Sequence, residues 1–175
     1  MTAPSAPHVA LLTDAFERIV GEGRRVLRGA SAQVLGYRPV PEANTVAWLV
    51  WHLTRVQDDH VADVAGVEQR WTAGGWAEKF GLAFDVADTG YGHTPEQVAA
   101  VRADAATLRG YLDDVHAATT SYLTTVTAAD LERVVDTRWD PPVTLGVRLV
   151  SVVGDDLQHV GQAAYVRGLA ERAGA

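Results

Sequence analysis

Two carboxylates and an imidazole lie close together near the C-terminal end of the sequence, in the segment Asp155-Asp156-Leu157-Gln158-His159. The carboxylates precede the histidine by four and three residues, and in a helix both spacings place side chains on one face. Carboxylate oxygen and imidazole nitrogen are common ligands of divalent metals. The segment therefore predicts part of a metal site, in which either aspartate could accompany His159.

Such a site needs a third donor, and His52 is the candidate. It lies in the apolar run Trp48-Leu49-Val50-Trp51-His52-Leu53, far from His159 in the sequence. If the two helices pack together, two histidines and one aspartate give a site with three protein ligands and open positions for water or substrate. Taken alone, His52 could equally be a histidine at the edge of the core that is bonded to a carbonyl group.

The two aspartates belong to different rows of the predicted helix. Asp155 shares a polar row with Arg148 and His159, whereas Asp156 lies on an apolar row with Val160. A carboxylate on an apolar row is costly unless it binds a metal or accepts hydrogen bonds. The residues themselves leave the choice between the two aspartates open.

The run from Trp48 to Leu53 and the pattern Asp155-x-x-x-His159-x-Gly161-Gln162 resemble the two metal-ligand segments of the DinB-like superfamily. The resemblance spans most of the chain. It implies a four-helix bundle with one divalent metal, held by a histidine of the second helix and by an x-x-x-His pair of the last helix. Carried onto this sequence, the metal ligands are His52, Asp155 and His159, so the family spacing favours Asp155.

The same resemblance implies a function. Members with known activity are similar to thiol-dependent S-transferases and isomerases, so we expect a metal-dependent enzyme that uses a mycothiol-type thiol and an electrophilic substrate. Zn²⁺ is the expected metal, and two imidazoles with one carboxylate also admit Ni²⁺, Fe²⁺ or Mn²⁺. The mycothiol-dependent maleylpyruvate isomerases carry a further C-terminal domain, so that particular activity is not expected here. The alternative is a non-enzymatic, metal-stabilised homodimer that acts as a binding or stress-response module.

Helical periodicity and capping residues predict the elements that must position these donors. We expect an all-α fold, a four-helix bundle of DinB-like type, as a single domain over residues 1–175 with a loose tail at residues 1–7. The expected helices cover about 9–27, 45–64, 94–126 and 145–172, the second capped by Asn44 and the last by Thr144. A long, glycine-containing loop over residues 66–93 joins the second and third helices.

For several residues near these elements, two structural roles are possible from the sequence. His60 lies about 12 Å along the helix from His52, too far to share one metal, so it is a core histidine or a group that supports the site. Asp59 either lines a pocket or is solvated. Four residues of the long loop either cover the metal or pack within the loop: Trp71, Trp76, Tyr91 and His93.

Composition narrows the class of protein. The chain has 175 residues, 47% of them hydrophobic, which suits one domain with a sizeable core. The net charge of −7, with Lys79 as the sole lysine, disfavours a nucleic-acid partner. We expect no membrane span, no secretory signal and a cytoplasmic location, because the sequence has neither a long apolar run nor a charged start followed by an apolar stretch. The absence of cysteine excludes disulfides and thiolate ligands, and the arginine-rich composition hints at an actinobacterial source.

Overall fold

The computed structural model describes residues 6–175, so most of the predicted tail lies outside the described residues, and Pro7 already begins the first helix. The described chain has the predicted all-α fold. Its elements follow in the order α1 (Pro7–Leu27), α2 (Ala32–Leu35), α3 (Val46–Ala65), α4 (Arg70–Ala73), α5 (Trp76–Phe80), α6 (Pro95–Ala100), α7 (Ala105–Leu123), the 3₁₀ turn η1 (Asp130–Glu132), β1 (Val134–Asp136), β2 (Val143–Thr144) and α8 (Leu145–Arg172).

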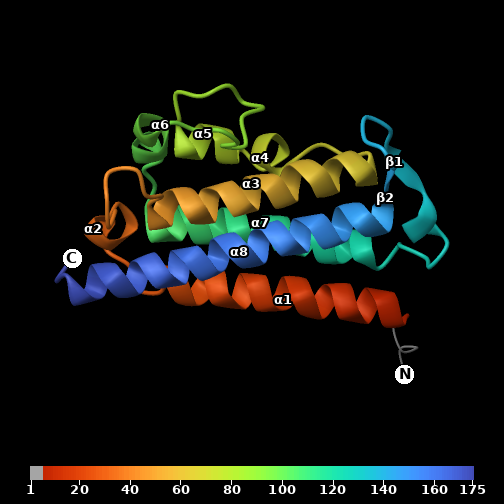
Figure 1. Ribbon diagram of the computed structural model, residues 1–175, viewed down its shortest axis with the longest axis horizontal. Helices are drawn as coiled ribbons and strands as arrows, with labels where there is room; N and C mark the ends of the chain where they lie inside the picture. Colours follow the sequence, from red (N-terminus) through yellow and green to blue (C-terminus); the bar gives the residue numbers. More distant parts are fainter. Residues whose placement is uncertain (1–5) are drawn as a thin grey trace.

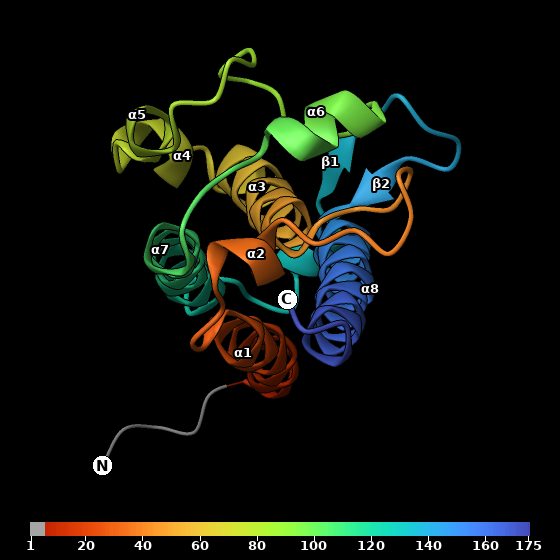
Figure 2. The ribbon, with the colours of Figure 1, turned by 90° about the vertical axis from the view of Figure 1, so that its left-hand side faces the viewer.

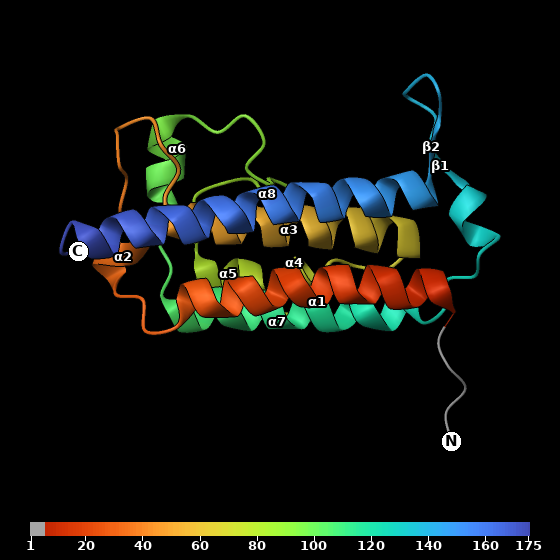
Figure 3. The ribbon, with the colours of Figure 1, turned by 60° about the horizontal axis from the view of Figure 1, so that its bottom comes forward.

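The long helices α1, α3, α7 and α8 run side by side along the longest axis of the molecule (Figure 1). In the end-on view, α3 packs against α7 and α8, and α1 closes the ring by packing against the same two helices (Figure 2). Figure 3 shows α8 alongside α3 over most of its length. The helix that carries His52 therefore lies directly against the helix that carries Asp155 and His159.

Capping fixes where these helices begin and end. Thr45, Asp104 and Thr144 each accept a hydrogen bond from the backbone N–H three residues further on, which satisfies one free donor of α3, α7 and α8 respectively. Gly66 ends α3 in the left-handed conformation, at φ 68°. The cap of α8 is the predicted one, whereas α3 is capped by Thr45 rather than by Asn44, because the chain turns into the helix one residue later.

The core consists of two clusters of buried apolar side chains that meet at α3. One gathers around Trp51 and Tyr111 beneath α4 and α5, and the other gathers around Phe16, Leu53 and Leu149 between α1 and α8. Because α3 contributes to both clusters, burial of apolar surface fixes its rotation relative to both α7 and α8. That rotation sets the direction in which His52 points.

Two segments differ from the expected helices. The third expected helix, over 94–126, is divided into α6 and α7, because residues 101–104 leave the helical conformation. Val101 is buried there, and Asp104 begins the new helix with its own side-chain cap. Ahead of α8, Val134 pairs with Thr144 and Asp136 with Val143 in a short antiparallel ribbon that no alternating pattern indicates. Between residues 6 and 175, no helix is both long and apolar enough to cross a membrane.

Candidate metal centre

The packing of α3 against α8 brings together the three residues that the sequence predicts as donors. One ligand atom from each of His52, Asp155 and His159 lies within 4.8 Å of the other two. The two imidazole rings have their centroids 4.7 Å apart. His52 is buried, and the other two residues are half-buried. Two nitrogen donors and one oxygen donor at this separation can converge on one divalent ion.

His52 is held by a backbone oxygen and by a neighbouring aromatic ring. Its Nδ1 lies 2.6 Å from the carbonyl oxygen of Thr89, and its ring stacks on Trp48 at a centroid distance of 4.5 Å. A carbonyl oxygen only accepts, so Nδ1 carries the proton and Nε2 keeps a free lone pair. Burial lowers the pKa of His52, and the bond to Thr89 opposes that shift. The neutral ring with a free Nε2 is the form that binds a metal.

His159 is oriented by its own helix. Its Nδ1 lies 2.9 Å from the backbone oxygen of Asp155, which again leaves Nε2 as the free nitrogen. The Oδ2 atom of Asp155 is buried without a hydrogen-bond partner among the described residues, and it lies 3.7 Å from the same Nδ1. A buried carboxylate oxygen without a partner is costly, and a bound cation would remove that cost. The donor set therefore fits a divalent metal ion.

The structure separates the two aspartates that the residue pattern leaves open. Asp156 is fully buried, and neither of its carboxyl oxygens has a partner in the part of the chain that is described. Burial raises the pKa of Asp156 well above its usual value. Its side chain lies among the core residues of α8 rather than with the histidines, so the geometry groups Asp155 with His52 and His159.

The loop that follows α5 supplies groups that the sequence analysis did not assign. Asp88 accepts a hydrogen bond from Gly90 N at 2.7 Å and lies 3.0 Å from His93 Nε2. His93 Nδ1 in turn accepts from the indole N–H of Trp48 at 3.0 Å. His93 is therefore connected through Trp48 to His52, on which the Trp48 ring stacks.

Glycine at position 90 lets this loop approach His52. A Cβ atom there would lie 2.9 Å from the Trp51 ring and 3.0 Å from His52 Nδ1, and the backbone has φ +94°. Both facts require glycine. The loop is also tied to α3 by the buried Arg55, whose Nε donates to the backbone oxygen of Asp88 at 3.2 Å. In the sequence, the only indication that this loop approaches His52 is the pair Gly90 and Gly92 on either side of Tyr91.

The other aromatic candidates between residues 66 and 93 do not cover the cluster. Trp71 is buried against Trp51 and Tyr111, and the indole N–H of Trp76 donates to Asp114 at 2.8 Å. Tyr91 is 93% exposed. Of the four candidates, only the His93 ring lies near the histidine cluster, 6.2 Å from the Trp48 ring.

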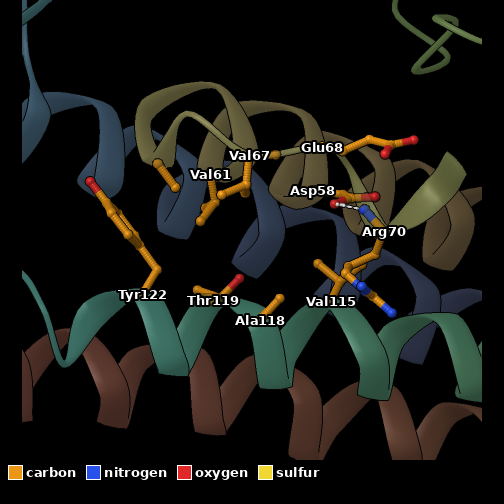
Figure 4. Close-up of a pocket in the computed structure, with 11 residues that line it drawn as sticks. Asp58, Val61, Val67, Glu68, Arg70, Val115, Ala118, Thr119 and Tyr122 are labelled. Atoms are coloured by element: carbon orange, nitrogen blue, oxygen red, sulfur yellow. Dashed lines mark hydrogen bonds between the residues drawn. The ribbon is translucent and has the colours of Figure 1, made fainter. Parts of the chain in front are cut away.

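A buried polar network next to α4 has a structural role. The Asp58 carboxylate accepts hydrogen bonds from Arg70 N, Trp71 N and the hydroxyl of Tyr111, at 2.8, 2.7 and 2.8 Å. Figure 4 shows Asp58 and Arg70 at one end of a small cavity of about 50 Å³, with Thr119 and Tyr122 of α7 along its opposite wall. None of the three metal donors lines this cavity. The network fixes α4 to α3 and α7.

Comparison with known proteins agrees with the family resemblance and with the fold. The sequence model of the DinB superfamily matches residues 15–163, a range that contains all three donors. A crystal structure titled as a conserved protein from Enterococcus faecalis is 33% identical, with a TM-score of 0.86 over 94% of this chain and 96% of that chain. No curated protein matches.

Proposed function

The chain belongs to the DinB superfamily, and from that membership and the donor set we propose that it is a metal-dependent enzyme that activates a low-molecular-weight thiol for transfer to an electrophile. His52, Asp155 and His159 would hold the metal, with Zn²⁺ as the expected ion. A bound divalent ion supplies Lewis-acid chemistry, which lowers the pKa of a coordinated thiol towards neutrality. Three protein donors leave room for such an exchangeable ligand.

One observation carries the metal proposal. Both histidines place Nδ1 against a backbone oxygen, while a buried oxygen of the Asp155 carboxylate has no hydrogen-bond partner. Backbone contacts of this kind orient metal-binding histidines and fix their tautomer. The residues thus present two neutral nitrogens and one charged oxygen at one point, and the chain has no cysteine that could provide an internal thiolate.

Elemental analysis of the purified protein tests this site. We expect about one divalent ion per chain, and loss of the ion in the double variant His52→Ala, His159→Ala. Asp155→Ala should weaken metal binding, and Asp156→Ala serves as the adjacent control that should retain it. Full occupancy of the double variant would reject the site, and the opposite behaviour of the two aspartates would move the carboxylate ligand by one residue.

Spectroscopy tests the role of the thiol. The Co²⁺-loaded protein mixed with mycothiol should develop a sulfur-to-metal charge-transfer band, because a thiolate would enter the exchangeable position. An electrophile should then be consumed faster than with either component alone. If neither mycothiol nor any other small thiol changes the spectrum at millimolar concentration, the transferase proposal is wrong.

A surface of α8 supports a second candidate, a metal-stabilised homodimer that acts as a binding module. Val147, Val150, Leu157 and Tyr165 are all exposed, and with Gly154 and Gly161 they follow a spacing of three or four residues along one face of the helix. An apolar stripe on a single helix can pair with its own copy about a twofold axis. Light scattering of Leu157→Glu against the wild-type protein tests the dimer; a wild-type mass of one chain would reject it.

A further inference from the structure

A cavity of about 730 Å³ lies at the end of the bundle where α2 and the segment after α6 meet the first turn of α3. Figure 1 shows this end on the left, and Figure 2 views it directly. Its volume is within the range of small-molecule sites, about 300–1,000 Å³. None of the three metal donors lines it. Ala47 on its wall precedes His52 by five residues, which turns the two side chains about 140° apart around α3, so the cavity is separate from the metal cluster.

Part of the cavity wall is apolar. Leu35 of α2, Ala47 of α3 and Val101 after α6 line it, and each is only 2–3% exposed. Ala99 of α6 lies on the same wall. These side chains offer no hydrogen bonds, so this part of the cavity suits the hydrocarbon portion of a ligand, whose burial is favourable by about 25 cal/mol per Å².

Two guanidinium groups line the cavity without a carboxylate partner. Arg38 donates from Nε to Ala43 O at 2.6 Å and from Nη1 to Pro95 O at 3.1 Å, and its Nη2 has no hydrogen-bond partner within residues 6–175. Arg102 donates from Nε to Ala99 O at 3.3 Å. All these acceptors are neutral backbone oxygens, so the hydrogen bonds leave both positive charges uncompensated.

One carboxylate belongs to the cavity wall. Asp104 caps α7, and its Oδ1 accepts a hydrogen bond from Thr107 N at 2.7 Å. This hydrogen bond lowers the pKa of Asp104, so the group is ionised at neutral pH. Glu96 of α6 is exposed and does not line the cavity. Two positive charges against one negative charge leave a surplus of one positive charge on the wall.

The start of α3 places further donors beside Arg38. The guanidinium is bonded to Ala43, two residues before the capping residue Thr45. Thr45 is 3% exposed, and its hydroxyl oxygen accepts from Trp48 N at 3.0 Å, which leaves the hydroxyl proton for a ligand. This cap is neutral, so it does not offset the positive end of the α3 dipole, whereas Asp104 does so for α7. The Arg38 side of the cavity is therefore the more favourable place for an anion.

We propose that this cavity binds a small monocarboxylic acid with an apolar body, with its carboxylate at Arg38 and Thr45 and its hydrocarbon part against Leu35 and Val101. The site is independent of the metal and of the thiol chemistry proposed above. A single negative charge matches the surplus charge of the wall, whereas the second charge of a phosphate monoester would have no partner. An uncharged molecule of the same length would bury the same hydrocarbon but lose the charged hydrogen bonds.

Isothermal titration calorimetry with octanoate tests the ligand class. Octanoate should bind the wild-type protein. Octan-1-ol has the same chain without the charge, and acetate has the charge without the chain, so each should bind at least about tenfold more weakly. Octylamine reverses the charge and should not bind. No binding of octanoate, or equal affinity for octanoate and octan-1-ol, overturns the proposal.

Variants of the wall test the location. Arg38→Met should weaken octanoate binding about tenfold, and Ala99→Phe should do the same by filling the cavity. Arg133→Met is the matched control for the arginine, because Arg133 also donates to a backbone oxygen, Val64 O at 3.1 Å, but lies next to β1 at the opposite end of the bundle (Figure 1). Ala100→Phe, at an exposed position outside the cavity wall, is the control for the added ring. Both controls should bind as the wild type does.

Two comparisons make the result decisive. If Arg38→Met lacks the wild-type circular dichroism spectrum, Arg102→Met replaces it, because Arg102 is exposed and bonds only to Ala99 O within the described chain. Unchanged octanoate affinity in the arginine variant and in Ala99→Phe would overturn the site. The double variant His52→Ala, His159→Ala should bind octanoate as the wild type does. Loss of binding in that variant would place the carboxylate on the metal and reject the cavity, whatever the elemental analysis gives.

Discussion

Replacing Gly90 by alanine tests whether the loop after α5 controls the metal centre. The added Cβ would lie 3.0 Å from His52 Nδ1 and 2.9 Å from the Trp51 ring, closer than ordinary van der Waals contact. Trp51 is buried in the core and cannot retreat, so the loop or His52 must move by a few tenths of an ångström. Either movement disturbs the 2.6 Å bond between Nδ1 and Thr89 O.

The size of the effect follows from what that bond does. It fixes the tautomer and orientation of His52, and loss of such a contact lowers metal affinity by about 10- to 100-fold. The left-handed backbone adds a separate penalty of about 1–2 kcal/mol to folding, because alanine is disfavoured at φ +94°. Metal affinity and stability should therefore both fall, for different reasons.

Gly92→Ala is the matched control. It lies in the same loop at φ +74°, but a Cβ there would meet nothing within 4 Å. Both variants should lose folding stability in urea titrations, Gly90→Ala more because of its clash with Trp51, whereas only Gly90→Ala should lose affinity for Zn²⁺ in a chelator-competition assay. If the two variants bind Zn²⁺ equally within twofold, the loop does not position His52 for the metal.

Three further substitutions test groups around the site. Tyr111→Phe removes the hydroxyl that donates to Asp58, so it should lower the free energy of unfolding by about 1–3 kcal/mol, while the exposed Tyr165→Phe should be neutral in the same urea titration. Asp156→Asn should raise the free energy of unfolding at pH 7 by about 1–3 kcal/mol, because burial raises the pKa of this carboxyl and favours its protonated form. This gain should disappear below about pH 4, where the carboxyl is protonated in both the folded and the unfolded protein. A loss of stability at pH 7 would instead reveal a partner for the carboxylate. The pKa of Asp136 is lowered mainly by its hydrogen bonds to Arg138, so the stabilising contribution of Asp136 exists above about pH 4 and is lost as the pH falls. Asp136→Asn should therefore have a lower urea midpoint than the wild type at pH 7. A difference in midpoint that stays constant down to pH 3 would contradict this.

The sequence predicted the helices that carry the donors because the relevant signals are local. Apolar spacing, the Thr144 cap and the i, i+4 relation of Asp155 to His159 all lie within one helix. The errors arise where local signals do not decide the structure. Asn44 and Thr45 are both good caps, and only the direction of the chain decides between them. The division between α6 and α7 depends on burial of Val101 against the other helices, which periodicity does not report.

The choice between Asp155 and Asp156 required the rotation of α8 relative to α3. Neighbouring residues of a helix point about 100° apart, so rotating α8 by about that angle would exchange the two carboxylates. That rotation is fixed by the core contacts of Leu149 and Val160, which bury Asp156 and leave Asp155 beside the histidines. The residues alone left the choice open, and only the family resemblance favoured Asp155.

The part of the site that the sequence missed lies between elements rather than within them. His52 owes its orientation to Thr89, and Thr89 is held in place by a loop whose Asp88 bonds to Gly90, His93 and Arg55. Two of these contacts, Thr89 O to His52 and Asp88 O to Arg55, join residues more than thirty positions apart through backbone oxygens, which any residue type provides. A pattern of side chains therefore predicts the candidate donors. The orientation of His52 depends on a loop conformation, and the loop glycines are its signal in the sequence.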